Sequence, residues 1–214
     1  MLLALPAVRG QEQESGDARV GYLIDVPVPL ETRDANQILG QLLRLGESAP
    51  ADERVTVVLR YAADSTSGEQ TAFEDALKLA RAMTGPDLRR VRVVSFVQGE
   101  VNGHSTLPIL SSDSLILSSG GVIADASAGE AGADQTIALS YGAIAERRGL
   151  FPEPIVAALI DPGLELAQVS KVGGEQVFAS GDDLETLRKS GEVLGEDVWS
   201  AAGVPLRLEA KQLR

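Results

Sequence analysis

Short apolar runs alternate with amphipathic segments along most of the chain, and this alternation restricts the fold more than any other feature. The runs are rich in Val, Ile and Leu, which is typical of buried strands. Strands that alternate with helices form parallel βαβ units with right-handed crossovers. The sequence therefore predicts an α/β fold with one predominantly parallel sheet. Its strands are expected at 20–26, 55–60, 91–97 and 113–118, with helices at 34–45 and 70–83.

The second half of the chain is predicted to be helical first and then rich in strands. Helices are expected at 103–112, 135–148 and 153–159, the second ended by Gly149. After the turn signal Asp161-Pro162-Gly163, two runs flank residues 171–174 as in a β-hairpin. Ser180 is the expected N-cap of a helix that reaches Lys189. The final stretch, 208–214, is typical of a helix start, so we expect the sequence to be a piece of a longer protein.

Three parts are predicted from this organisation. Residues 1–19 form a flexible N-terminus, in which the apolar MLLALPAV at 1–8 is either the remnant of a signal peptide or a frayed end. Residues 20–163 form the main domain. Residues 164–214 form a small β-rich extension, too short to be stable alone and therefore packed on that domain. The side chains that need such a surface are Leu164, Leu166, Val177, Phe178, Leu184 and Leu187.

Composition excludes several classes of function. A formal net charge of −12 argues against binding to nucleic-acid phosphates, which requires clustered Lys and Arg. The chain has no cysteine and a single histidine, His104, so disulfides, thiolate nucleophiles and Cys- or His-ligated metals are not expected. We therefore expect no metal and no cofactor. No run approaches the roughly 20 apolar residues that span a bilayer.

Several motifs follow one another in a fixed order along the chain. A strand, a polar loop and a helix occupy 55–83, and a strand, a loop and a short helix follow at 91–112. The run SSDSLILSSGGVIADAS then ends at residue 127. Further on come AIAERRG, ALIDPGLEL, VFASGDDLETLRKSGEV and LRLEAKQL. By their order and spacing these motifs resemble the ClpP-class domain of NfeD proteins, a family of membrane-associated serine proteases, from about residue 20 onward.

The resemblance implies a fold, a location and partners. The fold would be the ClpP/crotonase-like β/α spiral, usually built into oligomers, so a homo-oligomer is expected. The ligand or substrate would be a peptide or another protein. In the family the domain lies outside the cytoplasm, and a membrane segment and a small β-barrel often follow it. We therefore expect an extracytoplasmic, membrane-associated protein, anchored through a segment that is not in this chain.

Active members of the family resemble Ser/Lys dyad enzymes, and the dyad is altered here. A serine hydroxyl is a weak nucleophile until a base takes its proton, and a desolvated lysine can be that base. Counted from Asp113, the family's serine position is Gly103. Counted from AERRG at 145–149, the lysine position falls near Gly132. No lysine occurs between Lys78 and Lys171.

The family's oxyanion-hole loop is altered as well. A Pro-Gly-Gly loop supplies backbone N–H donors for the developing oxyanion in the family. In this sequence the corresponding residues are Thr66, Ser67 and Gly68, so the resemblance assigns what remains of the hole to Ser67 and Gly68. All parts of the catalytic apparatus are therefore missing or changed together.

Ser105 and His104 are the alternative nucleophile and base. Neighbouring residues of a helix point about 100° apart, so His104 is badly placed to activate Ser105. We interpret Ser105 as an exposed or N-terminal helix residue and His104 as a partly exposed polar residue at a helix start. Two hypotheses remain: a catalytically impaired pseudoprotease that acts as an oligomerising, peptide-binding scaffold, and an active serine endopeptidase that uses Ser105 with a base from another segment or subunit. The missing lysine favours the first.

The charged clusters are given ordinary interpretations. Asp182-Asp183 is predicted to be the first turn of a helix, which the helix dipole favours. Glu196-Asp197 is predicted to be a solvated loop. Arg147-Arg148 is interpreted as a charged helix end, although it could bind a carboxylate. An acyl-CoA enzyme of the same fold superfamily finds no clear match to its basic residues.

Overall fold

The computed structural model describes residues 21–50, 52–62, 70–130 and 134–213. The predictions made for residues 1–19 and for Thr66–Gly68 lie outside these residues. In the described part, no helix is both long enough and apolar enough to pass through a membrane.

A four-stranded parallel sheet forms the centre of the molecule. Its strands are β1 (Gly21–Val26), β2 (Val55–Tyr61), β3 (Val91–Val97) and β5 (Ser114–Leu117), in the order β1-β2-β3-β5. Every neighbouring pair in this sheet is parallel, as predicted from the alternation of strands and helices. The chain is therefore an α/β protein with a parallel sheet.

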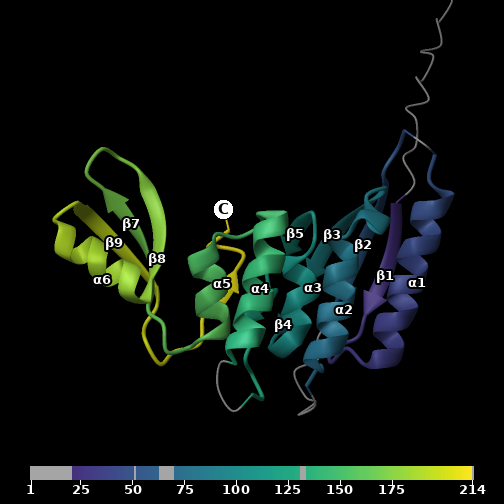
Figure 1. Cartoon of the computed structure of the whole chain (residues 1–214), viewed down its shortest axis with the longest axis horizontal. Coiled ribbons are helices and arrows are strands. Elements are labelled where there is room, and N and C mark those ends of the chain that lie inside the picture. Colours follow the sequence, from purple (N-terminus) through teal and green to yellow (C-terminus); the bar gives the residue numbers. More distant parts are fainter. Residues whose placement is uncertain (1–20, 51, 63–69, 131–133, 214) are drawn as a thin grey trace, which may run out of the picture.

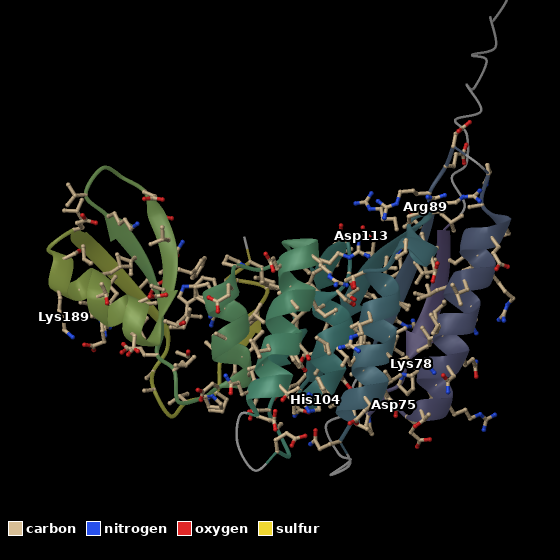
Figure 2. All side chains as sticks on the ribbon, viewed as in Figure 1. Asp75, Lys78, Arg89, His104, Asp113 and Lys189 are labelled. Carbon is tan, nitrogen blue, oxygen red and sulfur yellow. The ribbon has the colours of Figure 1, made fainter. Side chains whose placement is uncertain are left out.

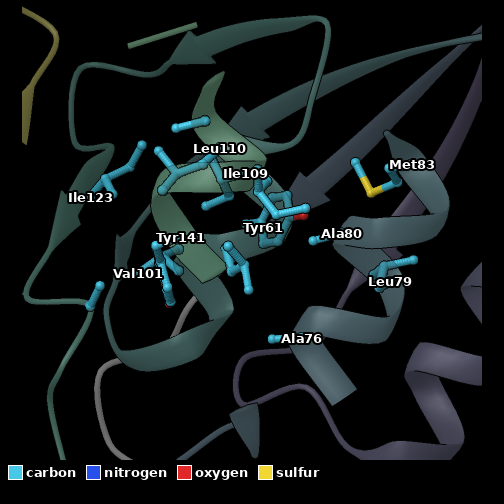
Figure 3. Close-up of a cluster of buried hydrophobic side chains, with 14 of the residues drawn as sticks. Tyr61, Ala76, Leu79, Ala80, Met83, Val101, Ile109, Leu110, Ile123 and Tyr141 are labelled. Carbon is cyan, nitrogen blue, oxygen red and sulfur yellow. The ribbon is translucent and has the colours of Figure 1, made fainter. Parts of the chain in front are cut away.

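The helices form one layer beside this sheet, as Figure 1 shows. They are α1 (Thr32–Ser48), α2 (Phe73–Met83), α3 (Thr106–Leu110), α4 (Gln135–Arg148) and α5 (Glu153–Ile160), with short 3₁₀ turns η1 (Pro86–Leu88) and η2 (Gly103–Ser105). Their apolar faces meet the sheet in a single large core. Figure 3 shows part of it, where Tyr61 lies between fully buried side chains of α2 and α3 and Tyr141 lies beside Val101. Dispersion and the hydrophobic effect at this interface hold the two layers together.

A small second sheet joins the end of the chain to the main body. It contains β4 (Glu100–Val101), β6 (Val122–Ala124) and β10 (Arg207–Glu209), with β10 antiparallel to β6. The helix start predicted at 208–214 is therefore wrong for the described residues up to Leu213. Leu206 and Leu208 are fully buried, so this segment has the two-residue period of a strand, and tertiary pairing outweighs the local motif.

The residues between α5 and β10 form a lobe of their own at one end of the molecule (Figure 1). A three-stranded antiparallel sheet, β8-β7-β9, carries α6 (Gly181–Ser190). The predicted hairpin is present as β7 (Leu166–Lys171) and β8 (Gln176–Ser180). Glu196-Asp197 lies inside β9 (Val193–Ser200), so the prediction of a solvated loop there is wrong. Pairing with β7 makes these residues part of an edge strand.

The apolar side chains of this lobe divide between two clusters. Leu166, Phe178 and Trp199 pack against the main core, as predicted for the first two. Leu184, Leu187 and Val177 instead build a local cluster with the inner residues of β7 and β8. For these three, the prediction of a contact with the main domain is wrong: α6 folds back on its own sheet, and Val177 of β8 packs against the same local cluster.

Candidate functional site

The candidate residues lie near the carboxyl ends of the parallel strands, where open α/β sheets usually bind ligands. The chain leaves β3, forms the two-residue strand β4 and enters η2, which contains Gly103, His104 and Ser105. Figure 2 shows His104 at the same end of the molecule as Asp75, in the first turn of α2. The fold therefore brings the predicted serine position to the end of the sheet where α/β proteins usually bind ligands.

Gly103 has a conformation that few other residues adopt. Its φ is +57°, in the left-handed region, where a side chain costs about 1–2 kcal/mol. A Cβ atom at this position would also collide with Oε1 of Gln70. The Gln70 amide can swing away, so the backbone conformation is the firmer obstacle. The N–H of Gly103 donates to the carbonyl of Asp125 at 2.8 Å, which fixes the turn.

His104 is buried, with 3% of its surface exposed. Its predicted position at a helix start is confirmed, since it lies in η2 directly before α3. The predicted partial exposure is wrong, because Phe73 of α2 and Tyr141 of α4 cover the imidazole. Its Nε2 lies 3.0 Å from Oε1 of Glu130, and its Nδ1 lies 3.1 Å from the hydroxyl of Tyr141. The ring of Phe73 meets it edge-on, with 5.2 Å between the ring centroids. Both ring nitrogens are therefore engaged by groups other than Ser105.

A chain of hydrogen bonds continues from His104 back to η2. The hydroxyl of Tyr141 lies 3.2 Å from Oγ1 of Thr106. The Thr106 hydroxyl in turn donates to the carbonyl of Gly103 at 2.9 Å. Burial raises the pKa of Tyr141 well above its usual range, so the phenol keeps its proton. A neutral phenol is a poor nucleophile. These hydrogen bonds therefore orient η2 and do not activate a reacting group.

Ser105 is also buried, with 1% of its surface exposed. The exposed alternative is therefore wrong, and the alternative of an N-terminal helix residue is confirmed, because Ser105 ends η2 and is the N-cap of α3. Its Oγ lies 2.5 Å from Oγ1 of Thr71, which in turn accepts a hydrogen bond from the N–H of Leu30 at 2.7 Å. Threonine cannot act as a general base near neutral pH. This hydroxyl pair therefore ties η2 to the segments that precede α1 and α2.

Several residues of this site were missed from the sequence. Glu130 and Tyr141 lie 26 and 37 positions after His104, and no local pattern relates them. Gln70, whose Cγ also lies against Gly129, follows a polar loop and carries no signal of its own. The position near Gly132, assigned to the family's lysine, and the loop residues Ser67 and Gly68 lie outside the described residues.

The charged clusters lie away from η2. Arg148 turns inward and binds Asp113 at 2.8 Å, and it donates to the backbone carbonyls of Ser111 and Met83. It is a charged helix end that does bind a carboxylate. Asp113 also accepts from the backbone N–H of Val93 at 2.8 Å, so it joins β3 to β5. The predicted first-turn position of Asp182-Asp183 in α6 is confirmed.

A groove of about 450 Å³ lies between α4 and α5, and none of the candidate residues lines it. Comparison with models of known protein families gives no match, and comparison with curated proteins gives none either. The class that fold and site define is an α/β protein with a parallel sheet and a tightly hydrogen-bonded turn at the expected site.

Proposed function

We propose that the chain is a catalytically impaired relative of the NfeD-type ClpP-class serine proteases. In this proposal it has the ClpP/crotonase-like β/α spiral and acts as an oligomerising, peptide-binding scaffold. The motif order of the sequence and the parallel sheet support the spiral. The oligomeric state, the peptide ligand and an extracytoplasmic, membrane-associated location rest on the resemblance alone.

The main support for the proposed loss of catalysis is the left-handed backbone conformation of Gly103. At the position that the resemblance assigns to the nucleophile there is no side chain, and the backbone disfavours one. General-base assistance is commonly worth about 10²–10⁴ in rate, so a nucleophile without its base would gain little even if one were supplied.

The neighbouring hydroxyl does not replace the missing serine. Ser105 is enclosed, its partner is Thr71, and both nitrogens of His104 are bonded elsewhere. For Ser105 to react, η2 would have to open and give up these hydrogen bonds. The geometry therefore counts against the second hypothesis, an endopeptidase that uses Ser105.

A fluorophosphonate probe tests the proposal directly. We expect no labelling of the full chain, no cleavage of a panel of unstructured peptides, and the same result for Ser105→Ala. An active serine hydrolase treated in parallel shows that the probe and the peptides are competent. Stoichiometric labelling at Ser105 that disappears in Ser105→Ala, together with peptide cleavage, would overturn the proposal.

Restoring the nucleophile alone is the stricter test. Gly103→Ser should not produce labelling or turnover, because the resemblance gives it no lysine to remove the proton. Gly103→Ala is the matched control, since it imposes the same backbone cost of about 1–2 kcal/mol without a hydroxyl. Activity in Gly103→Ser and not in Gly103→Ala would mean that a base is present, and the proposal would fail.

A further inference from the structure

The parallel sheet has two faces, and its register separates them. On one face Ile24, Leu59 and Leu115 lie in one row and belong to the core beneath the helices. The neighbouring rows point the other way, because side chains alternate along each strand. Register pairs Leu23 with Val58, Val58 with Val94, and Val94 with Ser114. The next outward row is Asp25, Arg60, Phe96 and Ile116.

These two outward rows contain a continuous apolar band. It runs diagonally across the four strands and consists of Leu23, Val58, Val94, Phe96 and Ile116, which we call the outer band. None of the five belongs to the large core cluster beneath the helices. Val94, at the centre of the band, is only 8% exposed, and Val58 and Phe96 are half-buried. Leu23 is 57% exposed and Ile116 is 52% exposed.

Parallel sheets occur almost only where both faces are covered. In the described part of the chain, the helices leave this face open (Figure 1). An exposed apolar band on an otherwise acidic protein is typical of an interaction site, because a partner that covers it removes apolar surface from water.

Charged residues border the outer band at opposite corners. Asp25 and Arg60 form an ion pair of 2.6 Å at the β1–β2 corner, and the Asp25 side chain remains 68% exposed. The hydrogen bond from Arg60 lowers the pKa of Asp25, so its carboxylate is charged at neutral pH. At the opposite corner, exposed Arg92 on β3 pairs in register with Thr56, two residues before Val94 and Val58 and therefore on the same face.

We propose that the outer band is the interface with a second copy of this chain, related by a two-fold axis that runs along the band. The argument is one of charge complementarity. Such an axis places the outward sheet face of one copy against the same face of the second copy. It also brings the residues on one side of the band opposite those on the other side in the second copy. It therefore brings Asp25 of each copy opposite Arg92 of the other, while Val58 and Ile116 stack near the axis.

The spacing of a sheet supports this pairing. Strands lie about 4.8 Å apart and residues rise about 3.3 Å along a strand. On this grid the line between Asp25 and Arg92 is centred at about Val58. The line perpendicular to it passes between Val94 and Phe96 and reaches Ile116. The two-fold axis that pairs Asp25 with Arg92 is therefore the same one that places the apolar residues of the two copies against each other.

The size of the surface sets the expected affinity. Four strands and about five rows give on the order of 300 Å² per copy, below the roughly 800 Å² of a standard interface. A concentration-dependent dimer is therefore expected rather than a permanent one. The inference rests on the oligomerising part of the proposed function, and it specifies which surface is used.

Sedimentation of the full chain over a range of micromolar concentrations tests the proposal. We expect a dimer in the wild type and at least about tenfold weaker association for Ile116→Asp. Arg92→Glu and Asp25→Lys should each weaken the dimer, because each opposes like charges across the axis. The double variant should recover association relative to either single one. Arg89→Glu is the matched control: it makes the same charge change at an exposed residue after η1 (Figure 2) and should have no effect.

Circular dichroism of each variant shows whether it still folds, and the charge swap keeps the test valid if Ile116→Asp does not. A wild type that stays monomeric throughout would overturn the proposal, as would a dimer that none of these substitutions weakens. A monomer in which Leu23 and Ile116 are protected from solvent footprinting would mean that another part of the chain covers the band, which also overturns it. None of these results depends on fluorophosphonate labelling, so the two proposals fail separately.

Discussion

The hydroxyl groups of Thr71 and of Ser105, the last residue of η2, lie 2.5 Å apart, and the backbone N–H of Leu30 donates to the Thr71 hydroxyl. All three residues are buried. A buried donor or acceptor that loses its partner costs about 1–3 kcal/mol, because water cannot replace the bond. At the scale of the residue, these hydrogen bonds therefore hold three segments of the chain together.

Thr71→Val tests how much these hydrogen bonds stabilise the fold. The substitution keeps the shape of the side chain but removes the acceptor for Leu30 and the partner of Ser105. We expect the free energy of unfolding to fall by about 1–3 kcal/mol, measured by denaturant titration. Thr71→Ser keeps the hydroxyl and should lose clearly less. Equal losses in both variants would show that the Thr71 methyl group, and not the hydroxyl pair, stabilises this turn.

At the scale of the element, α4 shows how a local signal fixes a boundary. Asp134 is its N-cap, and its carboxylate accepts from the N–H groups of Thr136 at 2.7 Å and Ile137 at 3.3 Å. Gly149 ends the helix with a φ of +64°. These caps satisfy backbone groups that the helix itself leaves unpaired.

The Asp134 cap gives a pH-dependent prediction. The backbone hydrogen bonds from Thr136 and Ile137 lower the pKa of Asp134 from 3.8. A lowered pKa means stabilisation that is present above the unfolded value and lost as pH falls through the folded one. Asp134→Ala should therefore lower the melting temperature at pH 7, and the difference from wild type should shrink well below pH 3.8. Asp134→Asn keeps an acceptor without a charge and should lie between them at pH 7. A difference that stays constant with pH would contradict the cap.

Elements with a local signal were predictable, and contacts between distant elements were not. The strand at 91–97 and the helix at 135–148 match the structure residue for residue, because a β-branched apolar run marks the first and Gly149 marks the end of the second. The strand β10 was missed, since its partner β6 lies about 85 residues earlier. The burial of His104 was missed for the same reason: Glu130 and Tyr141 come from segments that only tertiary packing brings to it.

At the scale of the whole molecule, the described residues form two apolar clusters of unequal size. The large one contains the helix–sheet interface and also Leu206 and Leu208 of the returning chain end. The small one is formed by the lobe of β7, β8, β9 and α6 around Leu184. Trp199, the only tryptophan of the sequence, packs edge-on against Phe178, with 4.7 Å between ring centroids, and touches the large cluster. It therefore reports on the junction between the lobe and the main body.

We predict that the lobe can lose its structure before the main body does. Leu184→Ala removes the central side chain of the small cluster, and a buried Leu→Ala change costs about 2–5 kcal/mol. In denaturant, Trp199 fluorescence should change earlier in this variant than in wild type. The far-UV circular dichroism transition, dominated by α1 to α5, should move little. Leu208→Ala removes a side chain of the large cluster and should shift the circular dichroism transition instead. If both signals move together in both variants, the clusters unfold as one unit, and Leu166, Phe178 and Trp199 bind the lobe too tightly for it to unfold alone.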